Sequence, residues 1–137
     1  PAMEPLKIVG VRASGAYRHM KPERAIDDNI GTFWNSGGWK GWLEIDLGKE
    51  VPLAEIKYTI QFAPAGNGTV QIYASGEPMG GDRTKATLIK TIAGHMKNND
   101  EFLVECPPRL SARYLQINCP QARSWFCIRE VIVRSSQ

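Results

Sequence analysis

The 137-residue chain lacks long apolar runs, a strong excess of one charge and a large set of cysteines. No apolar stretch approaches the roughly 18–20 residues that a membrane-spanning helix needs, so no membrane span is expected. The 17 lysines and arginines exceed the 14 aspartates and glutamates by only three. Histone-like and ribosomal proteins carry a much denser positive charge, and no nucleic-acid-binding motif is present here. We therefore expect no nucleic acid partner.

The three cysteines form no CxxC pair, which argues against a thiolate metal cage or a redox pair. Cys119 ends one strand-like segment and Cys127 begins the next, so a disulfide between them is one interpretation, with Cys106 left unpaired. The other interpretation is that all three are small buried apolar side chains. The cysteines do not decide the compartment.

Motifs for catalysis are also missing. The sequence contains no G-x-S-x-G elbow, no H-E-x-x-H, no Walker loop and no G-x-G-x-x-G after a strand. The only histidines, His19 and His95, stand beside no obvious nucleophile. Glu44 and Asp46 lie two residues apart, but neighbouring carboxylates on one face of an alternating strand indicate a solvated outer face more than a glycosidase pair. We predict no catalytic residue and no enzyme activity.

What the chain does contain is a recurring alternation of apolar and polar residues, which is typical of β-strands. Apolar residues fall at every second position in Gly41–Gly48, and Ala54–Phe62 repeats the pattern. Turn sequences such as Asn67-Gly68 separate the strands, and Pro22–Ile26 indicates one short helical turn. About eight antiparallel strands predict an all-β sandwich or jelly roll, with residues 1–137 as a single domain. The remaining strands are predicted at Lys7–Ala13, Thr69–Ala74, Thr87–Ala93, Glu101–Cys106, Arg113–Cys119 and Cys127–Arg134.

The segment Arg24–Ser36, with the sequence RAIDDNIGTFWNS, combines carboxylates, a hydroxyl and a glycine in a short loop. Carboxylate, hydroxyl and carbonyl oxygens are the ligands of a hard cation such as Ca²⁺, which takes about 6–8 of them. On spacing alone, Asp27-Asp28-Asn29 is equally a capping turn, because the segment is not an EF-hand.

Four segments in this order resemble one family: RAIDDNIGTFWNS, WLEIDLG, ARYLQIN and IREVIV, which extend from Arg24 to Val133. The chain is similar to the discoidin (coagulation factor type C) superfamily, and within it is most similar to the family 32 carbohydrate-binding modules. The resemblance implies a galactose-binding-like jelly-roll β-sandwich with a structural Ca²⁺ at one rim. We also expect a secreted or periplasmic, monomeric protein.

The resemblance implies which residues hold this Ca²⁺. They supply oxygen atoms from one loop and from the last strand. The ligands are the carboxylates of Asp27 and Glu130, the hydroxyl and carbonyl of Thr32, and the carbonyls of Arg24 and Asn29. These groups would neutralise the ion and connect the loop to the final strand. Asp28 stands where the family usually has glycine. The alternative is a turn without metal, held by hydrogen bonds of Asp27.

Ligand sites of the family lie on loops at one end of the sandwich. The residues expected there in this chain are Arg18, His19, Lys21, Asn67, Arg123, Trp125 and Phe126. Trp125 or Phe126 matches the aromatic platform on which a sugar ring stacks. Galactose-binding relatives often have an arginine after a proline in the loop that here reads Phe62-Ala63-Pro64-Ala65-Gly66-Asn67. That arginine is missing, which argues against plain galactose recognition.

Basic residues occur instead on the other loops expected at this end. Arg18, Lys21 and Arg123, with His19 nearby, would converge on one rim and suit carboxylates along a polymer, because a guanidinium binds a carboxylate with two hydrogen bonds. We predict a non-catalytic module for an acidic polysaccharide such as polygalacturonic acid (pectin). The alternative is that these residues are ordinary solvated surface charges.

Two further functions stay open at this point. One is binding of a neutral galactose- or GlcNAc-type glycan. The other is adhesion to protein or anionic phospholipid, as in blood-clotting discoidin domains, through exposed apolar side chains on the same loops. The residues available for adhesion are Trp39, Trp125, Phe126 and Met20. By resemblance, Trp34 and Trp42 are expected to pack in the core or against a sheet, and only Trp39 of this group is expected to be exposed.

Overall fold

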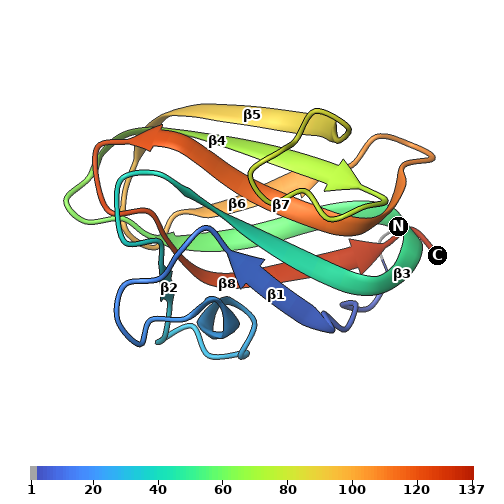
Figure 1. The fold of residues 1–137 in the computed structure, drawn as a ribbon, viewed down its shortest axis with the longest axis horizontal. Coiled ribbons are helices and arrows are strands. Elements are labelled where there is room, and N and C mark those ends of the chain that lie inside the picture. Colours follow the sequence, from blue (N-terminus) through green and yellow to red (C-terminus); the bar gives the residue numbers. More distant parts are fainter. Residues whose placement is uncertain (1–2) are drawn as a thin grey trace.

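The structure is a computed structural model that describes residues 3–137, within which eight strands and one turn of 3₁₀ helix are found (Figure 1). The helical turn η1 spans Pro22–Ala25, as the sequence predicts. The strands are β1 (Gly10–Ala13), β2 (Trp34–Asn35), β3 (Gly41–Gln61), β4 (Gly66–Ser75), β5 (Thr87–Met96), β6 (Glu101–Glu105), β7 (Ser111–Ala122) and β8 (Cys127–Ser135). Among residues 3–137, no helix has the length and apolar character needed to cross a membrane.

Strand β3 belongs to two antiparallel sheets and turns the corner between them. Sheet 1 contains β1, the first half of β3, β7, β4 and β5, and sheet 2 contains β2, β8, the second half of β3 and β6. At the corner the pairing with β7 shifts register, and Gly48 adopts a left-handed φ of 84°. The all-β sandwich is confirmed. The two strands predicted at Gly41–Gly48 and Ala54–Phe62 are one strand, because residues 49–53 stay extended through the bend.

The two sheets enclose one apolar core. Alternate residues of β3 point into it, among them Leu43 from sheet 1 and Ile56 and Ile60 from sheet 2. Burying a side chain of this size contributes about 1.5–3 kcal/mol, so the alternation along β3 is a main source of stability. Trp34 is fully buried, as predicted, and its indole N–H donates to the Gly15 carbonyl at 2.8 Å. That bond fixes the loop after β1 against the core.

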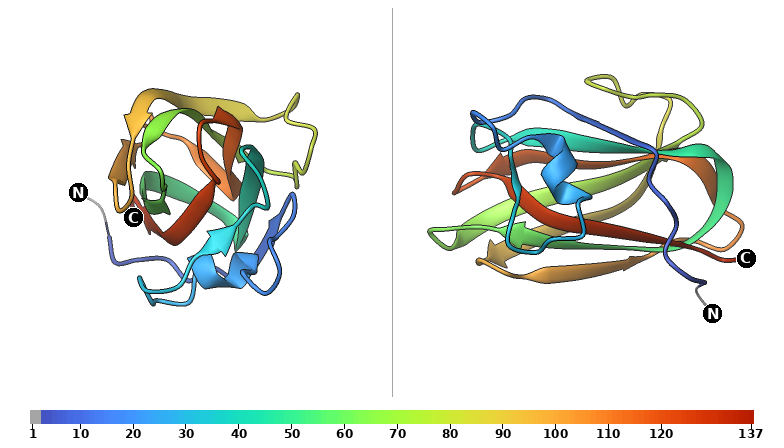
Figure 2. Two further views of the ribbon diagram at one scale, coloured as in Figure 1. Left: turned by 90° about the vertical axis from the view of Figure 1, so that its left-hand side faces the viewer. Right: turned by 90° about the horizontal axis from the view of Figure 1, so that it is seen from below.

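The two ends of the sandwich differ. Both termini lie at one end, where the backbone N–H of Met3 donates to the Ser135 carbonyl at 3.1 Å and that of Leu6 to the Val133 carbonyl at 2.8 Å. Loops between the strands gather at the opposite end, on the left of Figure 1 and facing the viewer in the left panel of Figure 2. We call this end the rim; it consists of residues 14–21, 36–40, 62–65 and 123–126.

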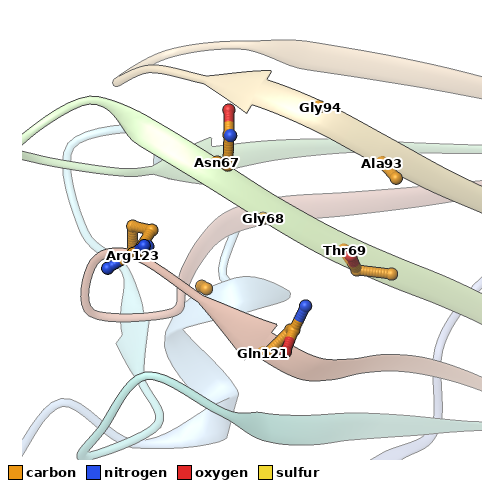
Figure 3. Close-up of a pocket in the computed structure, with 8 residues that line it drawn as sticks. Asn67, Gly68, Thr69, Ala93, Gly94, Gln121 and Arg123 are labelled. Carbon is orange, nitrogen blue, oxygen red and sulfur yellow. The ribbon is translucent and has the colours of Figure 1, made fainter.

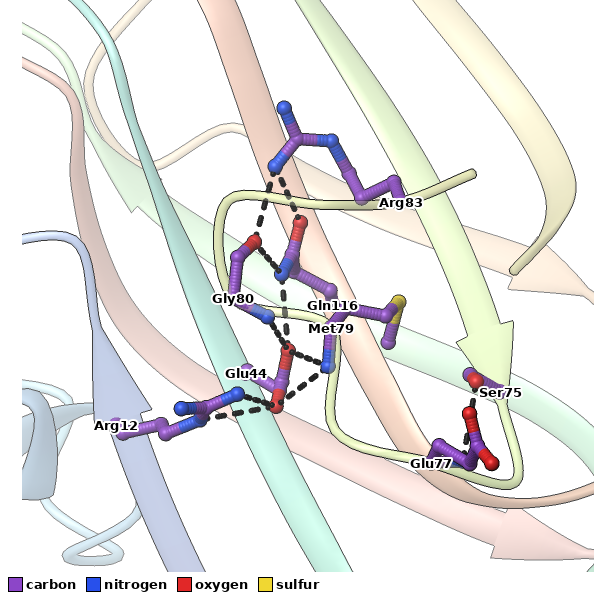
Figure 4. Close-up of polar contacts among 8 residues, drawn as sticks. All are labelled: Arg12, Glu44, Ser75, Glu77, Met79, Gly80, Arg83 and Gln116. Atoms are coloured by element: carbon purple, nitrogen blue, oxygen red, sulfur yellow. Dashed lines mark hydrogen bonds and ion pairs between the residues drawn. The ribbon is translucent and has the colours of Figure 1, made fainter. Parts of the chain in front are cut away.

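Glu44 lies on the outer face of sheet 1 and is only 2% exposed, so the prediction of a solvated carboxylate there is wrong. The loop of residues 76–86, between β4 and β5, crosses the sheet and covers it (Figure 4). The Glu44 carboxylate accepts the backbone N–H groups of Met79 at 3.1 Å and Gly80 at 2.9 Å. It also accepts the Gln116 amide at 2.9 Å and the Arg12 guanidinium at 2.8 Å. These donors compensate the cost of burying the charge.

Asp46, the second carboxylate on this face, stays partly exposed. Arg113 donates to it at 2.9 Å, and this hydrogen bond lowers the pKa of Asp46 below its ordinary value. Both carboxylates of β3 therefore pair with arginines of neighbouring strands, Glu44 with Arg12 and Asp46 with Arg113.

All three cysteines are free thiols. Cys119 lies opposite Gly41 in sheet 1, whereas Cys127 lies opposite Gln61 in sheet 2, so the disulfide interpretation is wrong and the buried-side-chain interpretation is confirmed for this pair. Burial raises the pKa of both thiols to about 12. Thiols of this kind are inert at neutral pH.

Candidate functional site

Backbone hydrogen bonds hold three loops of the rim together. The N–H of Tyr17 donates to the Asn35 carbonyl at 2.9 Å, which joins the loop after β1 to β2. The N–H of Phe126 donates to the Gly38 carbonyl, and the N–H of Ser36 donates to the Phe126 carbonyl, each at 2.9 Å. These two bonds join the loop between β7 and β8 to the loop before β3. Side chains from opposite ends of the sequence therefore share one surface.

An exposed aromatic pair occupies this surface. The ring centroids of Tyr17 and Trp125 are 5.7 Å apart, and the rings are tilted by 52°. Tyr17 is 36% exposed and Trp125 is 44% exposed. Open aromatic faces of this kind offer a stacking surface to the apolar side of a sugar ring.

Arg18 adds positive charge to the pair. Its guanidinium carbon lies 5.1 Å from the centroid of the Tyr17 ring, within the range of a cation–π contact. Arg18 has a positive φ of 53°, a backbone conformation that is uncommon for an arginine and often occurs at functional loops. Arg18 and Trp125 thus lie on the same rim, as predicted. Tyr17, which connects them, directly precedes Arg18 in the same loop after β1.

Arg123 extends the surface towards β4. Its backbone N–H donates to the Asn67 carbonyl at 2.8 Å. A Cβ atom on Gly66 would lie 2.9 Å from the Cβ of Arg123, so this close approach requires glycine. Arg123, Asn67 and Gln121 line a cavity of about 510 Å³ beside β4, β5 and β7 (Figure 3). Asn67 is part of β4, so the prediction of a hairpin turn at this residue is wrong.

Four other residues named from the sequence, Phe126, His19, Lys21 and Trp39, differ in their exposure and contacts. Phe126 is fully buried, with its ring edge-on to Trp34 at 5.9 Å, so the predicted platform role of Phe126 is wrong and Trp125 alone is exposed. His19 and Lys21 are exposed, but within residues 3–137 no hydrogen bond or ion pair joins their side chains to the aromatic pair. Trp39 is 56% exposed, as predicted.

Oxygen atoms converge in the loop after η1. The hydroxyl of Thr32 donates to a carboxylate oxygen of Asp27 and lies 3.1 Å from the Asn29 carbonyl and 3.5 Å from the Arg24 carbonyl. The other Asp27 oxygen accepts the backbone N–H of Asn29 at 3.0 Å. Asp28 has a φ of 58°, the left-handed conformation that explains the family's glycine and that aspartate tolerates. The residues predicted to bind Ca²⁺ from this loop therefore share one small volume.

Glu130, on β8, faces this loop from the sheet. One of its carboxylate oxygens, Oε1, is buried and has no hydrogen-bond partner in the described part of the chain. Burial, followed by the negative charges of Asp27 and Asp28, raises the pKa of Glu130 to about 7. A cation would compensate both effects, and the donor set is all oxygen, which fits a hard ion such as Ca²⁺. Within residues 3–137 no group of three or more His, Cys, Asp and Glu side chains is placed to hold a metal, so carbonyls and the Thr32 hydroxyl would have to complete this site.

The fold and the rim define a class of protein: a β-sandwich domain whose loops present exposed side chains at the end opposite both termini. The F5/8 type C domain model matches residues 10–132, and the chain belongs to this family. The resemblance to the discoidin superfamily is thereby confirmed. The comparison with curated proteins found no match.

Solved structures of family 32 carbohydrate-binding modules share the fold. The CBM32 of AlyQ in complex with 4,5-unsaturated mannuronic acid is 21% identical with a TM-score of 0.76, covering 96% of this chain and 98% of that one. A pectin-binding carbohydrate-binding module is 18% identical with a TM-score of 0.73, covering 96% and 94%. The CBM32-1 and CBM32-2 domains of Clostridium perfringens ZmpB in complex with GalNAc are 19% identical with a TM-score of 0.75, covering 96% of this chain and 34% of that one. This chain also spans 34% of a truncated AlyQ that includes an alginate lyase domain.

Proposed function

We propose that the protein is a non-catalytic carbohydrate-binding module that binds its ligand at the rim. The observation that carries this proposal is the exposed Tyr17–Trp125 ring pair with the Arg18 guanidinium beside it. Aromatic faces stack on sugar rings, and guanidinium groups hydrogen-bond their polar substituents. The surface is shallow and buries little of a ligand, so the affinity is modest.

We propose an acidic polysaccharide such as polygalacturonic acid as the ligand. Arg18 and Arg123 form no ion pair with a carboxylate of residues 3–137, so both charges remain available to a ligand. Ligands named for two of the similar structures, a mannuronic acid derivative and pectin, also contain uronic acids. GalNAc, the ligand of a third, is neutral, so the charge of the ligand is the feature to test.

The test is affinity electrophoresis through gels that contain polygalacturonate or a neutral galactan. We expect retardation by polygalacturonate, and weaker retardation as salt rises, because salt screens exposed charges. Retardation by galactan alone would replace the acidic ligand with a neutral galactose-type glycan. Retardation by neither, together with sedimentation on phosphatidylserine liposomes, would replace carbohydrate binding with adhesion to phospholipid.

We further propose that Ca²⁺ is bound by the loop after η1, with a structural role. Asp27, Thr32 and Glu130 would hold the ion through side-chain oxygens, and Arg24 and Asn29 through their carbonyls. The proposal is supported by the convergence of these oxygens and by the unpartnered Oε1 of Glu130. The ion would supply positive charge that joins the loop to β8.

We propose a secreted or periplasmic, monomeric module in which residues 1–137 form one folding unit. Polysaccharides of the pectin type occur outside cells, which favours an exported binding module. Size-exclusion chromatography with light scattering would test the monomer, and a single cooperative unfolding transition by two spectroscopic probes would test the single folding unit.

A further inference from the structure

A second groove begins at the rim and continues over the outer face of sheet 1. Its volume is about 490 Å³, and it lies between the loop before β3, the strand β7 and the loop of residues 76–86. Ser14, Ser36, Lys40, Trp42, Arg83 and Asn118 contribute side chains to its lining. The groove shares no lining residue with the cavity beside Arg123 and Asn67.

Arg83 is held at the groove by neutral groups. Its Nη1 donates to the Gly80 carbonyl and to the Gln116 side-chain oxygen, each at 3.1 Å (Figure 4). Its guanidinium carbon lies 5.9 Å from the centroid of the Tyr73 ring. Its Nε and Nη2 donate no hydrogen bond to any residue of the described chain. The guanidinium is therefore positioned, its charge is not compensated by an ion pair, and two of its donor groups remain free.

The orientation of Gln116 explains why Arg83 is held in this way. The Gln116 amide nitrogen donates to Glu44 and to the Gly80 carbonyl, each at 2.9 Å, so its oxygen must face Arg83. The negative charge of Glu44 is paired with Arg12, not with Arg83. The fully buried amide of Gln116 thus lies between the Arg12–Glu44 ion pair and the Arg83 guanidinium.

The rest of the groove suits a sugar that carries a carboxylate. Lys40, a second basic residue, lines the groove in the loop before β3, and Trp42 is an aromatic residue of its lining whose ring has the Arg12 guanidinium carbon 5.6 Å from its centroid. The Asn118 amide nitrogen donates to Gln71 at 3.0 Å, which leaves its oxygen for a sugar hydroxyl. Asp82, the carboxylate next to Arg83 in sequence, is bonded to the hydroxyl of Thr84 at 2.7 Å rather than to the guanidinium.

We infer that this groove is a second subsite, in which Arg83 and Lys40 bind the carboxylate of a further unit along the acidic polysaccharide held at the rim. The inference rests on the proposed function. A guanidinium held by neutral partners loses little freedom when it binds a carboxylate, so the contact costs less than one made by a mobile arginine. Short ligands would occupy the rim only, and longer ones would reach the groove.

The test is calorimetric titration with oligogalacturonides of increasing length, beginning with the monomer. The groove variants are Arg83→Gln and Lys40→Gln, and Trp125→Ala is the rim variant. Lys49→Gln removes one exposed positive charge at the end that holds the termini, and serves as the control for net charge. We expect each groove variant to lose about fivefold in affinity for the long chains only. Trp125→Ala should weaken binding at every length, and Lys49→Gln should weaken it at none.

If Arg83→Gln and Lys40→Gln bind long chains like the wild type while Trp125→Ala weakens every length, the second subsite is wrong and the rim stands. If the wild type binds no oligogalacturonide, the subsite and the proposed ligand are both wrong. Lys40 makes no side-chain hydrogen bond within residues 3–137, so its replacement tests the groove even if Arg83→Gln unfolds the loop. Shifts of the Arg83 Nε–H nuclear magnetic resonance signal with long but not short ligands would support the subsite independently.

Discussion

The outer face of sheet 1 and the rim use the same residue type in opposite ways. On the sheet, Arg12 and Arg113 are bonded to the carboxylates of Glu44 and Asp46. At the rim, Arg18 contacts an aromatic ring, and neither it nor Arg123 forms an ion pair with a described carboxylate. An arginine bonded to a carboxylate of its own chain contributes to the fold. An arginine whose charge is left open on a constrained loop can contribute to binding.

The largest effect is expected from the carboxylate that Arg12 binds. Glu44→Gln would lose the ion pair with Arg12, and in either orientation its amide N–H would face a donor, either the backbone N–H groups of Met79 and Gly80 or the Arg12 guanidinium. We expect the free energy of unfolding to fall by about 3 kcal/mol. Urea denaturation measures this, with Asp46→Asn as a partly exposed control that should cost less. Equal costs for the two substitutions would mean that burial of Glu44 does not matter.

Much of the fold follows from the sequence because strand alternation records which face is buried. Alternation alone gave the wrong solvent exposure for Glu44, since its cover is the loop of residues 76–86, which follows it by more than thirty positions. At the rim, Trp125 and Phe126 are adjacent aromatic residues at the end of a loop, where no alternation extends, so which of them points outward depends on packing against Trp34. In the loop after η1 the oxygens lie close together in the sequence, yet spacing alone left a cation site and a capping turn equally open. The full set of predicted Ca²⁺ ligands, including Glu130 on β8, came from the family resemblance.

The next largest effect on stability is expected from the Ca²⁺ that we propose is bound by the loop after η1. Calcium should raise the unfolding temperature of the wild type, because a ligand that binds only the folded state stabilises it by about 2.7 kcal/mol at a concentration 100 times Kd. Asp27→Ala should abolish this increase. Thermal unfolding in EDTA and in calcium checks it, with Asp82→Ala as a control in a distant loop. The same calcium response in Asp27→Ala would show that the ion binds elsewhere or not through this carboxylate.

Replacing the exposed ring of the rim should affect binding and not stability. Trp125→Ala is expected to lower affinity for oligogalacturonides about tenfold or more, because an exposed stacking residue at a binding centre is a typical hot spot. Its matched control is Trp39→Ala, which removes a second exposed tryptophan from the neighbouring loop. Calorimetry and urea denaturation of both variants provide the comparison. A larger loss of affinity from Trp39→Ala would move the site to the other loop.

Substitutions of a rim arginine and of a sheet arginine should have different effects, the first on affinity and the second on stability. Arg123→Ala is expected to reduce affinity for the acidic ligand about fivefold and leave the unfolding curve unchanged. Arg113→Gln should lower stability slightly, through loss of its bond to Asp46, and leave affinity unchanged. If Arg123→Ala and Arg113→Gln both lose affinity, or if neither does, the proposed division between arginines that bind ligand and arginines that stabilise the fold is wrong.

The smallest effect concerns Glu130 in the calcium-free protein. Its pKa is raised from an ordinary value of 4.5 to about 7, so between these two values the folded state holds a proton that the unfolded state has released. Stability should therefore fall as pH rises from about 4.5 to 7 and then level off. Urea denaturation in EDTA at several pH values measures the slope, and Glu130→Gln should flatten it. An unchanged slope in that variant would assign the pH dependence to other groups.

The measurement that most directly tests the acidic ligand at the rim is calorimetric titration of the wild type with an oligogalacturonide and with its methyl ester. The two ligands share every ring and hydroxyl and differ in the methyl groups that neutralise the carboxylates of the ester. We predict that the acid binds about tenfold or more tightly than the ester, and that the difference narrows at high salt. Equal affinity for the two forms, or tighter binding of the ester, would contradict recognition by the open arginines.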